Sequence, residues 1–443
     1  MSRDFHRSGN DSNPFPGFNG AAMSRELFPG ASNGEYGAPP ELLPVLERGL
    51  GARVWDTSGR EWIDYTMAWG STLVGHAHPR VVEAATRQAS SGTNFAAVNR
   101  RAVELADRLH ALAPFLRRIR FVASGTEATL MCLRVAAAAT GRPKVLKFAG
   151  AYHGQHPVGV AAMLRGNAPD GHSADGWGTG ADWIASRVLA APFNDLAATE
   201  NLIQQHAGEL AAVIVEPVHR CLAPVPGFLE GLRAITRRHG IVLIFDEVVT
   251  GFRLAPGGAA QHFGVEPDLA AYGKALGGGF PIGAYGGSEV LMEVVNEARI
   301  DEPSYLWSAS TTGGNPVSCA AALAVLDVLC APGVHKSLHK LGSKFRELLA
   351  AVLQAESETA QVLGIGPLAQ IAFAAEPIRD HAGWQRADRQ RGAALMLELL
   401  RSRVFLNPMG TKLYLSIAHD DAILTQFAER LAAALRSTRP KSA

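Results

Sequence analysis

Three short segments of this 443-residue chain carry side chains that could do chemistry together. In the first, Ser124, Gly125 and Thr126 open a predicted helix directly after the predicted strand 118–123. Small residues let a backbone approach an anion closely, and the N–H groups and dipole of a helix start attract phosphate, with the Thr126 hydroxyl as a further donor. An ordinary helix cap has the same composition, so this segment alone does not decide between the two.

The second segment places Asp246 and Glu247 at the end of the apolar run 241–245. In a parallel α/β sheet, ligands bind at the carboxyl ends of the strands. A carboxylate at that edge can pair with a protonated ring nitrogen. The simpler alternative is a pair of solvated charges at the end of a strand.

The third segment centres on Lys274, which stands between an apolar stretch and the glycines 277–279. Such a lysine is uncrowded and can form a Schiff base with a carbonyl cofactor, although most lysines are simply solvated. A phosphate loop, an aspartate at a strand end and a later lysine together predict a pyridoxal 5'-phosphate site.

The elements that must position these residues alternate along the chain. We predict strands over 118–123, 144–148, 211–215 and 241–245, and helices over 126–139 and 228–239. Such alternation predicts an α/β fold with a mostly parallel sheet and helices on both faces. A hairpin over 53–65 and helices over 79–85 and 99–112 precede this region, and two long helical segments follow residue 316.

The end of the chain, with a strand over 370–374 and a helix over 387–401, is typical of a smaller α+β domain. We therefore divide the chain into an N-terminal segment (1–75), a large cofactor-binding domain (76–325) and a C-terminal small domain (326–443). The first twenty residues are predicted to form a flexible tail, or an arm that orders only against a partner.

Composition excludes several classes of protein. Hydrophobic residues make up 47% and charged residues 19%, which argues against a disordered chain. The 42 basic and 41 acidic residues nearly cancel, whereas nucleic-acid binders usually have a basic excess. The four cysteines are dispersed and fit buried thiols in a reducing compartment. The sequence has no run typical of a signal peptide or a spanning helix, so we expect a cytoplasmic protein without a membrane or nucleic-acid partner.

Other motifs are weak. The run 30–34 matches a nucleophile elbow, and 364–369 matches a dinucleotide fingerprint, but neither has the strand and helix that its motif requires. The histidine pairs His76 with His78, and His153 with His156, have no cysteine or carboxylate near them in sequence. We therefore expect loop histidines and no metal site.

The chain resembles the class III aminotransferases of fold type I, and within them the glutamate-semialdehyde aminomutase branch. The stretches that carry this resemblance are WGSTLVGHAHP (69–79), FVASGTEA (121–128), AYHGQH (151–156), VEPV (215–218), PGFLEGLR (226–233), the block 245–287 and TTGGNP (311–316). They lie within residues 40 to 435, and the block 245–287 is highly specific. The resemblance implies a large sheet domain and a smaller α+β domain built from both ends of the chain.

By this resemblance, Lys274 would bind pyridoxal 5'-phosphate and move the proton between the substrate carbon and C4′ of the cofactor. Asp246 would pair with the ring nitrogen and keep it protonated. Tyr152 would stack on one face of the ring, and Val248 would pack against the other.

The remaining implied roles concern the rim of the site. Ser124, Gly125 and Thr126 would hold the phosphate, and His153 and Glu216 would line the cofactor. Trp69 would line the substrate pocket, and Arg253 would be structural. Thr311 would reach the phosphate of the neighbouring subunit, which implies a homodimer with shared active sites.

The sequence departs from the aminomutases where they hold the substrate carboxylate. The position of their clamping arginine is Gly37, and the stretch 407–412 lacks the second arginine of related β-amino-acid aminotransferases. The stretch 218–221 also breaks the aminomutase pattern. Since no other side chain reproduces an arginine fork, we expect a substrate whose carboxylate is absent, esterified or distant. The alternative is a relocated clamp made by Arg220, Lys412 or Arg100.

These features favour an aminotransferase that moves an amino group from a small-molecule donor to a carbonyl acceptor in two half-reactions. An intramolecular aminomutase, an epimerase or a decarboxylase on the same fold is the alternative. A non-catalytic protein that binds pyridoxal phosphate is a third possibility, but Lys274 and Asp246 are both present and argue against it.

Overall fold

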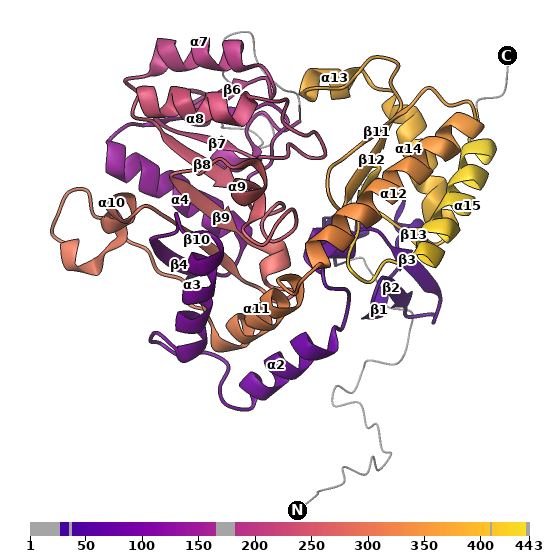
Figure 1. Ribbon diagram of the computed structural model, residues 1–443, viewed down its shortest axis with the longest axis horizontal. Coiled ribbons are helices and arrows are strands. Elements are labelled where there is room, and N and C mark those ends of the chain that lie inside the picture. Colours follow the sequence, from indigo (N-terminus) through magenta and orange to yellow (C-terminus); the bar gives the residue numbers. More distant parts are fainter. Residues whose placement is uncertain (1–26, 35–37, 165–181, 408–409, 440–443) are drawn as a thin grey trace, which may run out of the picture.

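The computed structural model describes residues 27–34, 38–164, 182–407 and 410–439. In Figure 1 the large sheet and the helices that cover it lie at the left, and a smaller group of helices and short strands lies at the right. The predicted tail over residues 1–20, the last four residues and Gly37 lie outside the described residues.

The large sheet has seven strands in the order β4-β10-β9-β8-β7-β5-β6. Their bounds are β4 (Arg118–Val122), β5 (Lys144–Phe148), β6 (Val188–Ala191), β7 (Leu210–Val215), β8 (Val242–Asp246), β9 (Leu269–Tyr272) and β10 (Gly283–Gly287). Five consecutive strands, β9 to β6, pair in parallel, and β10 is antiparallel to both of its neighbours. The prediction of a mostly parallel α/β sheet is confirmed.

Helices cover both faces of this sheet, because its central strands are apolar on both sides. Alternate residues of β7 and β8 belong to two separate cores: Val213 and Leu243 to one, Ile214 and Ile244 to the other. The first core includes α2 (Pro79–Ala89), α3 (Arg100–Leu112), α7 (Leu196–His206), α8 (Phe228–Arg238) and α11 (Pro316–Leu329). The second is formed with α4 (Gly125–Thr140).

The smaller part combines both ends of the chain. One sheet has the order β1-β2-β3-β13 and the other β11-β12-β14. These strands are β1 (Leu46–Leu50), β2 (Arg53–Asp56), β3 (Glu61–Asp64), β11 (Gln361–Leu363), β12 (Leu368–Ala372), β13 (Val404–Phe405) and β14 (Lys412–Tyr414). They pack with α12 (Val334–Ala355), α14 (Arg389–Arg401) and α15 (Asp421–Ser437), which lie side by side in Figure 1.

A single aromatic cluster ties these two ends together. The ring of Tyr65 lies 5.3 Å from that of Phe345 and 4.6 Å from that of Phe427. Residues before 76 and residues after 340 therefore share one hydrophobic core. The exact boundaries 75 and 325 stay a prediction.

Short helices occupy the loops at the edge of the large sheet and on the surface. They are α1 (Met67–Gly70), α5 (Pro157–Val160), α6 (Asp182–Ala185), α9 (Gly258–Phe263), α10 (Glu289–Met292) and α13 (His381–Arg386).

Most predicted elements lie within one or two residues of the observed ones. The predicted strand 370–374 begins two residues earlier, at Leu368, and the predicted helix 387–401 begins at Arg389. The helix starts there because the Asp388 side chain accepts a hydrogen bond from the backbone N–H of Arg391, which makes Asp388 the N-cap.

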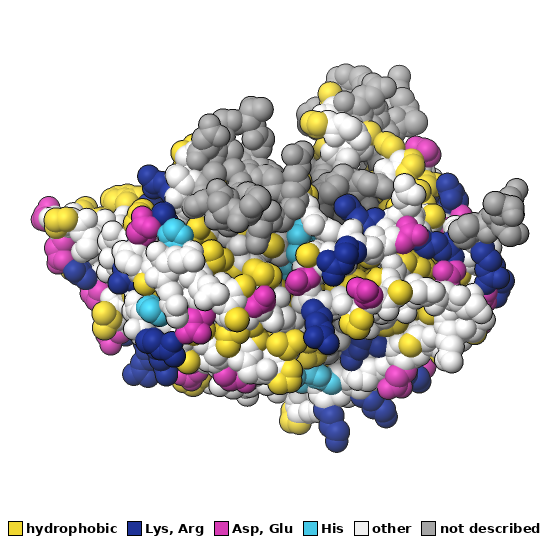
Figure 2. Space-filling model, turned by 90° about the horizontal axis from the view of Figure 1, so that it is seen from above, with side chains coloured by type: hydrophobic (Ala, Val, Ile, Leu, Met, Phe, Trp, Pro, Cys, Tyr) yellow, Lys and Arg dark blue, Asp and Glu magenta, His cyan; other side chains and the backbone are white. Residues whose placement is uncertain are grey.

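The described surface carries charges of both signs. Figure 2 shows Lys and Arg side chains interspersed with Asp and Glu side chains over the face in view. In the described ranges, no single helix has both the length and the apolarity to cross a membrane. The helices α11 and α12 meet that criterion only as a pair bent by 74°, and most of α11 is buried in the first core.

Candidate active site

The neighbouring parallel strands β8 and β9 bring the two predicted catalytic residues to one edge of the sheet. β8 ends at Asp246, which pairs in register with Ala271 of β9, and Lys274 follows β9 after Gly273. Asp246 is 5% exposed and Glu247 is fully buried. The alternative that these carboxylates are solvated end charges is therefore wrong.

Asp246 is held by a histidine and a backbone amide. Its Oδ2 atom lies 2.7 Å from Nδ1 of His153, and Oδ1 accepts a hydrogen bond of 3.1 Å from the backbone N–H of Val248. A carboxylate only accepts, so Nδ1 of His153 carries the shared proton. The other ring nitrogen, Nε2, is buried and has no hydrogen-bond partner among the described residues.

Glu216 follows β7 and accepts hydrogen bonds from two loops at this edge, those of Tyr152 and Arg220. Oε1 accepts the backbone N–H of Tyr152 at 3.2 Å, and Oε2 accepts that of Arg220 at 3.0 Å. Burial alone would raise the pKa of Glu216, but the neighbouring charges, that of Arg220 above all, lower it to about 2. Glu216 is therefore ionised at neutral pH.

The predicted phosphate loop is a tightly packed helix start. The Ser124 side chain caps α4 by accepting the N–H of Glu127 at 3.1 Å, and the Thr126 hydroxyl accepts the N–H of Gln155 at 3.3 Å. A Cβ atom on Gly125 would lie 2.8 Å from a methyl group of Val248. Only glycine fits there, and the first N–H groups of the helix have no partners within the helix itself.

Trp69 belongs to an unusual turn on the small-domain side of the site. Met67, Ala68 and Trp69 have φ values of 45°, 50° and 58°, in the left-handed region that non-glycine residues rarely adopt. The Asp64 carboxylate holds the start of this turn by accepting the backbone N–H groups of Thr66 and Met67. Strain of this kind concentrates at functional sites, and the Trp69 ring stays 37% exposed.

Tyr414 is a site residue that the sequence analysis missed. It lies in β14 two residues after Lys412, so both side chains leave the same face of the strand. The Lys412 ammonium lies 4.9 Å from the centre of the Tyr414 ring. The spacing of two residues, which puts both side chains on one face of a strand, was the signal that could have found it.

Arg253 packs against the same ring. It is fully buried, and its guanidinium lies 5.5 Å from the ring centre of Tyr414. Its Nε atom donates to the carbonyl of Val249 at 2.8 Å, and Nη2 donates to the carbonyl of Gly70. Burial lowers the pKa of Arg253 to about 10.

Burial and neighbouring negative charges have opposite effects on the pKa values of Lys274 and Lys412. Burial lowers the pKa of Lys274, and the negative charges of Tyr414 and Asp246 only partly offset this effect. Burial would also lower the pKa of Lys412, but the neighbouring Tyr414 and Glu216 raise it above its ordinary value. Lys274 therefore loses its proton more easily than Lys412, as a nucleophilic amine must.

Arg220 reaches the cofactor side of the site. It has a left-handed φ of 60°, its Nε donates to the carbonyl of Gly150 at 3.0 Å, and its guanidinium lies 5.9 Å from the Tyr152 ring centre. Arg100, in contrast, has an exposed side chain at the start of α3 and pairs with Glu104 at 2.6 Å. Of the three proposed replacement clamps, Arg100 is the one turned to solvent in the single chain.

Thr311 lies on the surface of the single chain. Its carbonyl accepts a hydrogen bond of 2.9 Å from the Asn94 side chain, and the preceding Ser310 donates to the Glu127 carboxylate at 3.2 Å. Ser310 thus touches the first turn of α4, the helix that begins with the predicted phosphate loop.

The fold brings a carboxylate to one histidine of each pair, although none lies beside the pairs in the sequence. Nε2 of His76 lies 2.7 Å from Oδ2 of Asp64, and His153 contacts Asp246 as described above. Ligand atoms of His153, Glu216 and Asp246 lie within 4.8 Å of one another. The folding of distant segments onto one edge made these contacts, and the sequence spacing could not reveal them. The absence of a metal site stays a prediction.

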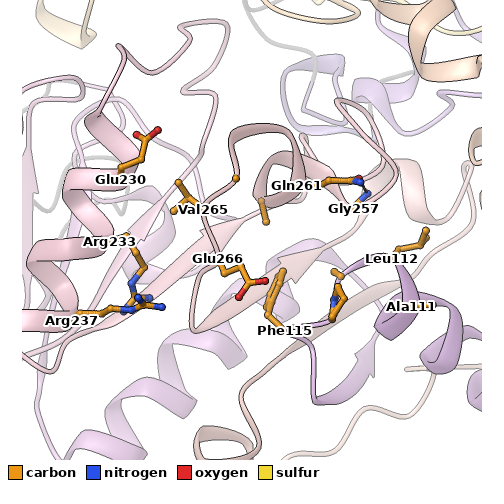
Figure 3. Close-up of a pocket in the computed structure, with 14 residues that line it drawn as sticks. Ala111, Leu112, Phe115, Glu230, Arg233, Arg237, Gly257, Gln261, Val265 and Glu266 are labelled. Atoms are coloured by element: carbon orange, nitrogen blue, oxygen red, sulfur yellow. Dashed lines mark hydrogen bonds between the residues drawn. The ribbon is translucent and has the colours of Figure 1, made fainter.

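A separate cavity of 680 Å³ opens at the other edge of the large sheet (Figure 3). Its lining includes Phe115, which precedes β4, and Glu266, which precedes β9, together with Arg233 and Arg237 of α8. Parallel strands begin at this edge and end at the edge that carries Asp246. The cavity contains no predicted site residue.

The residues at the Asp246 edge fit pyridoxal 5'-phosphate. Asp246 contacts His153 and the backbone N–H of Val248, and Glu216 holds the backbone of Tyr152 at the same edge. The helix α4 begins at Gly125, where N–H groups without partners in the helix suit a phosphate. A seven-stranded mostly parallel sheet with a lysine after β9 and an aspartate at the end of β8 defines a pyridoxal-phosphate enzyme of fold type I.

Comparison with known proteins gives the family. Residues 36–431 match the model of the class-III aminotransferases. A glutamate-1-semialdehyde 2,1-aminomutase from Roseiflexus castenholzii is 40% identical over 94% of this chain and 96% of its own length. The chain belongs to the class III aminotransferase family, and its cofactor is pyridoxal 5'-phosphate.

Solved structures agree. An omega-transaminase from Sphaerobacter thermophilus has a TM-score of 0.86 at 34% identity, covering 94% of this chain and 96% of its own. A transaminase with bound pyridoxal phosphate has a TM-score of 0.83 at 29% identity, covering 93% of this chain and 95% of its own.

Proposed function

We propose that this enzyme is an aminotransferase that takes an amino group from a small-molecule donor and delivers it to a carbonyl acceptor. The observation that carries the proposal is the pair of neighbouring strands that brings Lys274 and the Asp246–His153 pair to one edge. When bound, the cofactor supplies a carbonyl that accepts the amino group and a ring that accepts electrons.

In this proposal, Lys274 moves the proton. Because its pKa is lowered, the amine can take a proton from the substrate carbon. It would then deliver this proton to C4′ of the cofactor. Asp246, oriented by His153, keeps a negative charge toward the ring nitrogen. Tyr152 and Val248 hold the ring between them, and Ser124, Gly125 and Thr126 hold the phosphate.

We propose that Lys412, Arg220 and Trp69 face the substrate. Lys412 is 9% exposed, and no described carboxylate lies within ion-pair distance of its ammonium. A buried cation without an acidic partner is costly and suits an anionic ligand. This favours a relocated clamp over the carboxylate-free substrate expected from Gly37, which lies outside the described residues.

An intramolecular aminomutase is the second candidate, because relatives with 35 to 40% identity carry the name glutamate-1-semialdehyde 2,1-aminomutase. Arg220 at a glycine-like φ in the stretch 218–221 argues for a pocket that differs from theirs. Turnover of glutamate semialdehyde without any external keto acid would favour the mutase.

We further propose a homodimer in the cytoplasm. Thr311 is on the surface, and Val98 and Trp307 are 85% and 64% exposed, which suits a face covered by a second copy. Sedimentation analysis tests the dimer. A monomer with full activity would contradict it.

A donor screen read by cofactor absorbance tests the main proposal. We expect at least one amino donor to convert the bound cofactor to its amine form without an acceptor, and a carbonyl acceptor to reverse the change. Absence of any spectral change across amino acids and amines would exclude the aminotransferase.

The clamp is tested separately with matched pairs, an amino acid against its decarboxylated amine. We expect the acid to be preferred, and Lys412→Met to remove the preference by about 100-fold in kcat/KM, as loss of one charge-assisted contact does. Equal use of acid and amine by the wild type would favour the open pocket.

A further inference from the structure

A second buried lysine stands behind the site. Lys147 lies in β5 and is completely buried, and it shares with Val145 the face of the sheet that packs against α4. A buried ammonium is costly unless polar groups surround it.

The ammonium of Lys147 is surrounded by backbone carbonyls. Its Nζ atom lies 3.0 Å from the oxygen of Ala151, 3.2 Å from that of Val158, 2.9 Å from that of Gly159 and 2.6 Å from that of Ala161. All four belong to one segment, 151–161. A single side chain therefore draws both ends of this segment together.

This segment carries Tyr152, which we propose holds the cofactor ring, and His153, which contacts Asp246. Neighbouring polar groups support the same fold: the Thr129 hydroxyl donates to the carbonyl of His153, and Nδ1 of His156 accepts the N–H of Gly159 at 3.1 Å. The carbonyl of Gly159 in turn accepts the N–H of His153.

We infer that Lys147 is a positioning residue that fixes the segment 151–161 and thereby sets the Tyr152 ring and the His153 imidazole against Asp246. The inference rests on the proposed roles of Tyr152 and His153. Lys147 itself touches neither cofactor nor substrate. An ammonium suits this task because its three donors point in different directions, whereas the planar fork of arginine does not converge on four carbonyls.

The test compares Lys147→Met with Val145→Ala, a control that removes buried volume from the same strand and face. Hydrogen exchange of the backbone amides 151–161 is measured in protein freed of cofactor, and the Kd for pyridoxal phosphate is measured by titration. We expect Lys147→Met to speed exchange in 151–161 and to weaken cofactor binding by about 10-fold or more, as small misplacements do. Val145→Ala should lower Tm and leave both quantities within about 2-fold of the wild type.

Equal exchange and equal Kd in Lys147→Met and Val145→Ala would overturn the inference. If Lys147→Met does not fold, Lys147→Arg keeps the charge and the length. We expect Lys147→Arg to bind the cofactor with a higher Kd and an altered absorption spectrum, and wild-type values for both would also overturn it. The exchange measurement needs no cofactor, so it stands even if the wild type proves not to be an aminotransferase.

Discussion

Nδ1 of His153 lies 2.7 Å from Oδ2 of Asp246, although the two residues are 93 positions apart in the sequence. Both side chains are buried, at 1% and 5% exposure. The imidazole thus fixes the orientation of the carboxylate, the group that we propose stabilises a positive charge on the cofactor ring.

Asp246→Asn should therefore retain the cofactor but slow proton abstraction by about 10³-fold or more, because an amide cannot stabilise the charged ring nitrogen. Single-turnover absorbance with an amino donor measures this rate. His153→Gln should lower it less, since Asp246 keeps its charge. A near-normal rate in Asp246→Asn would remove Asp246 from the proposed role.

Gly125→Ala should weaken cofactor binding, because the new methyl group would lie within 2.8 Å of the Val248 side chain at the phosphate loop. We expect the Kd to rise about 10-fold or more. Val248→Ala removes the clashing methyl groups, so the double variant should bind nearly as well as Val248→Ala alone. Strictly additive losses in free energy would show that the two residues do not compete for this space.

Tyr414→Phe should shift the titration of Lys274. The negative charge of Tyr414 raises the pKa of Lys274, so its removal should lower that pKa further. The pH profile for the reaction of the cofactor-free protein with pyridoxal phosphate should move to lower pH, while the wild-type fold persists. An unchanged profile would mean that the phenol does not act on Lys274.

His156 predicts a pH-dependent stability. Burial and the neighbouring charges of His153 and Lys147 hold its pKa at about 4 in the fold, below its ordinary value of 6.5, although a hydrogen bond to the backbone of His153 acts in the opposite direction. A depressed pKa means that stability is present above pH 6.5 and is lost as the pH falls towards 4, since the unfolded state binds the proton first. Between pH 7 and 5 this loss is about 2 kcal/mol.

The measurement is the free energy of unfolding at several pH values in the wild type and in His156→Gln, which cannot bind the proton. The variant should lose less stability between pH 7 and 5. Parallel curves for the two proteins would contradict the assignment of this loss to His156.

The chemistry of the large domain could be predicted because each segment carries its own local signal. The apolar run before Asp246 makes a buried strand, and the small residues from Ser124 to Thr126 follow a strand and start a helix. Both patterns depend on neighbours in sequence. A parallel sheet then brings the strand ends together without further information.

The rest of the site depends on contacts between distant segments. Tyr414 reaches Lys274 only because β14 pairs with β12 and its Tyr414 N–H bonds to the carbonyl of Tyr65. The left-handed turn at Met67 and Trp69 has no glycine at either position, so the sequence contains no residue that indicates a positive φ there. Neither periodicity nor composition depends on such pairings between distant segments. The sequence therefore indicated Lys412 but not its neighbour Tyr414.

Borohydride reduction of the enzyme with bound cofactor, followed by peptide mass spectrometry, tests the central claim most directly. Lys274 and Lys412 both lie close enough to Tyr414 to lower the pKa of its phenol. The pKa of Lys274 is lowered and that of Lys412 is raised, so we expect Lys274 to be the nucleophile. We expect the cofactor mass on the peptide that contains Lys274, and no label in Lys274→Ala. Label on Lys412, or on any other lysine of the wild type, would contradict the account.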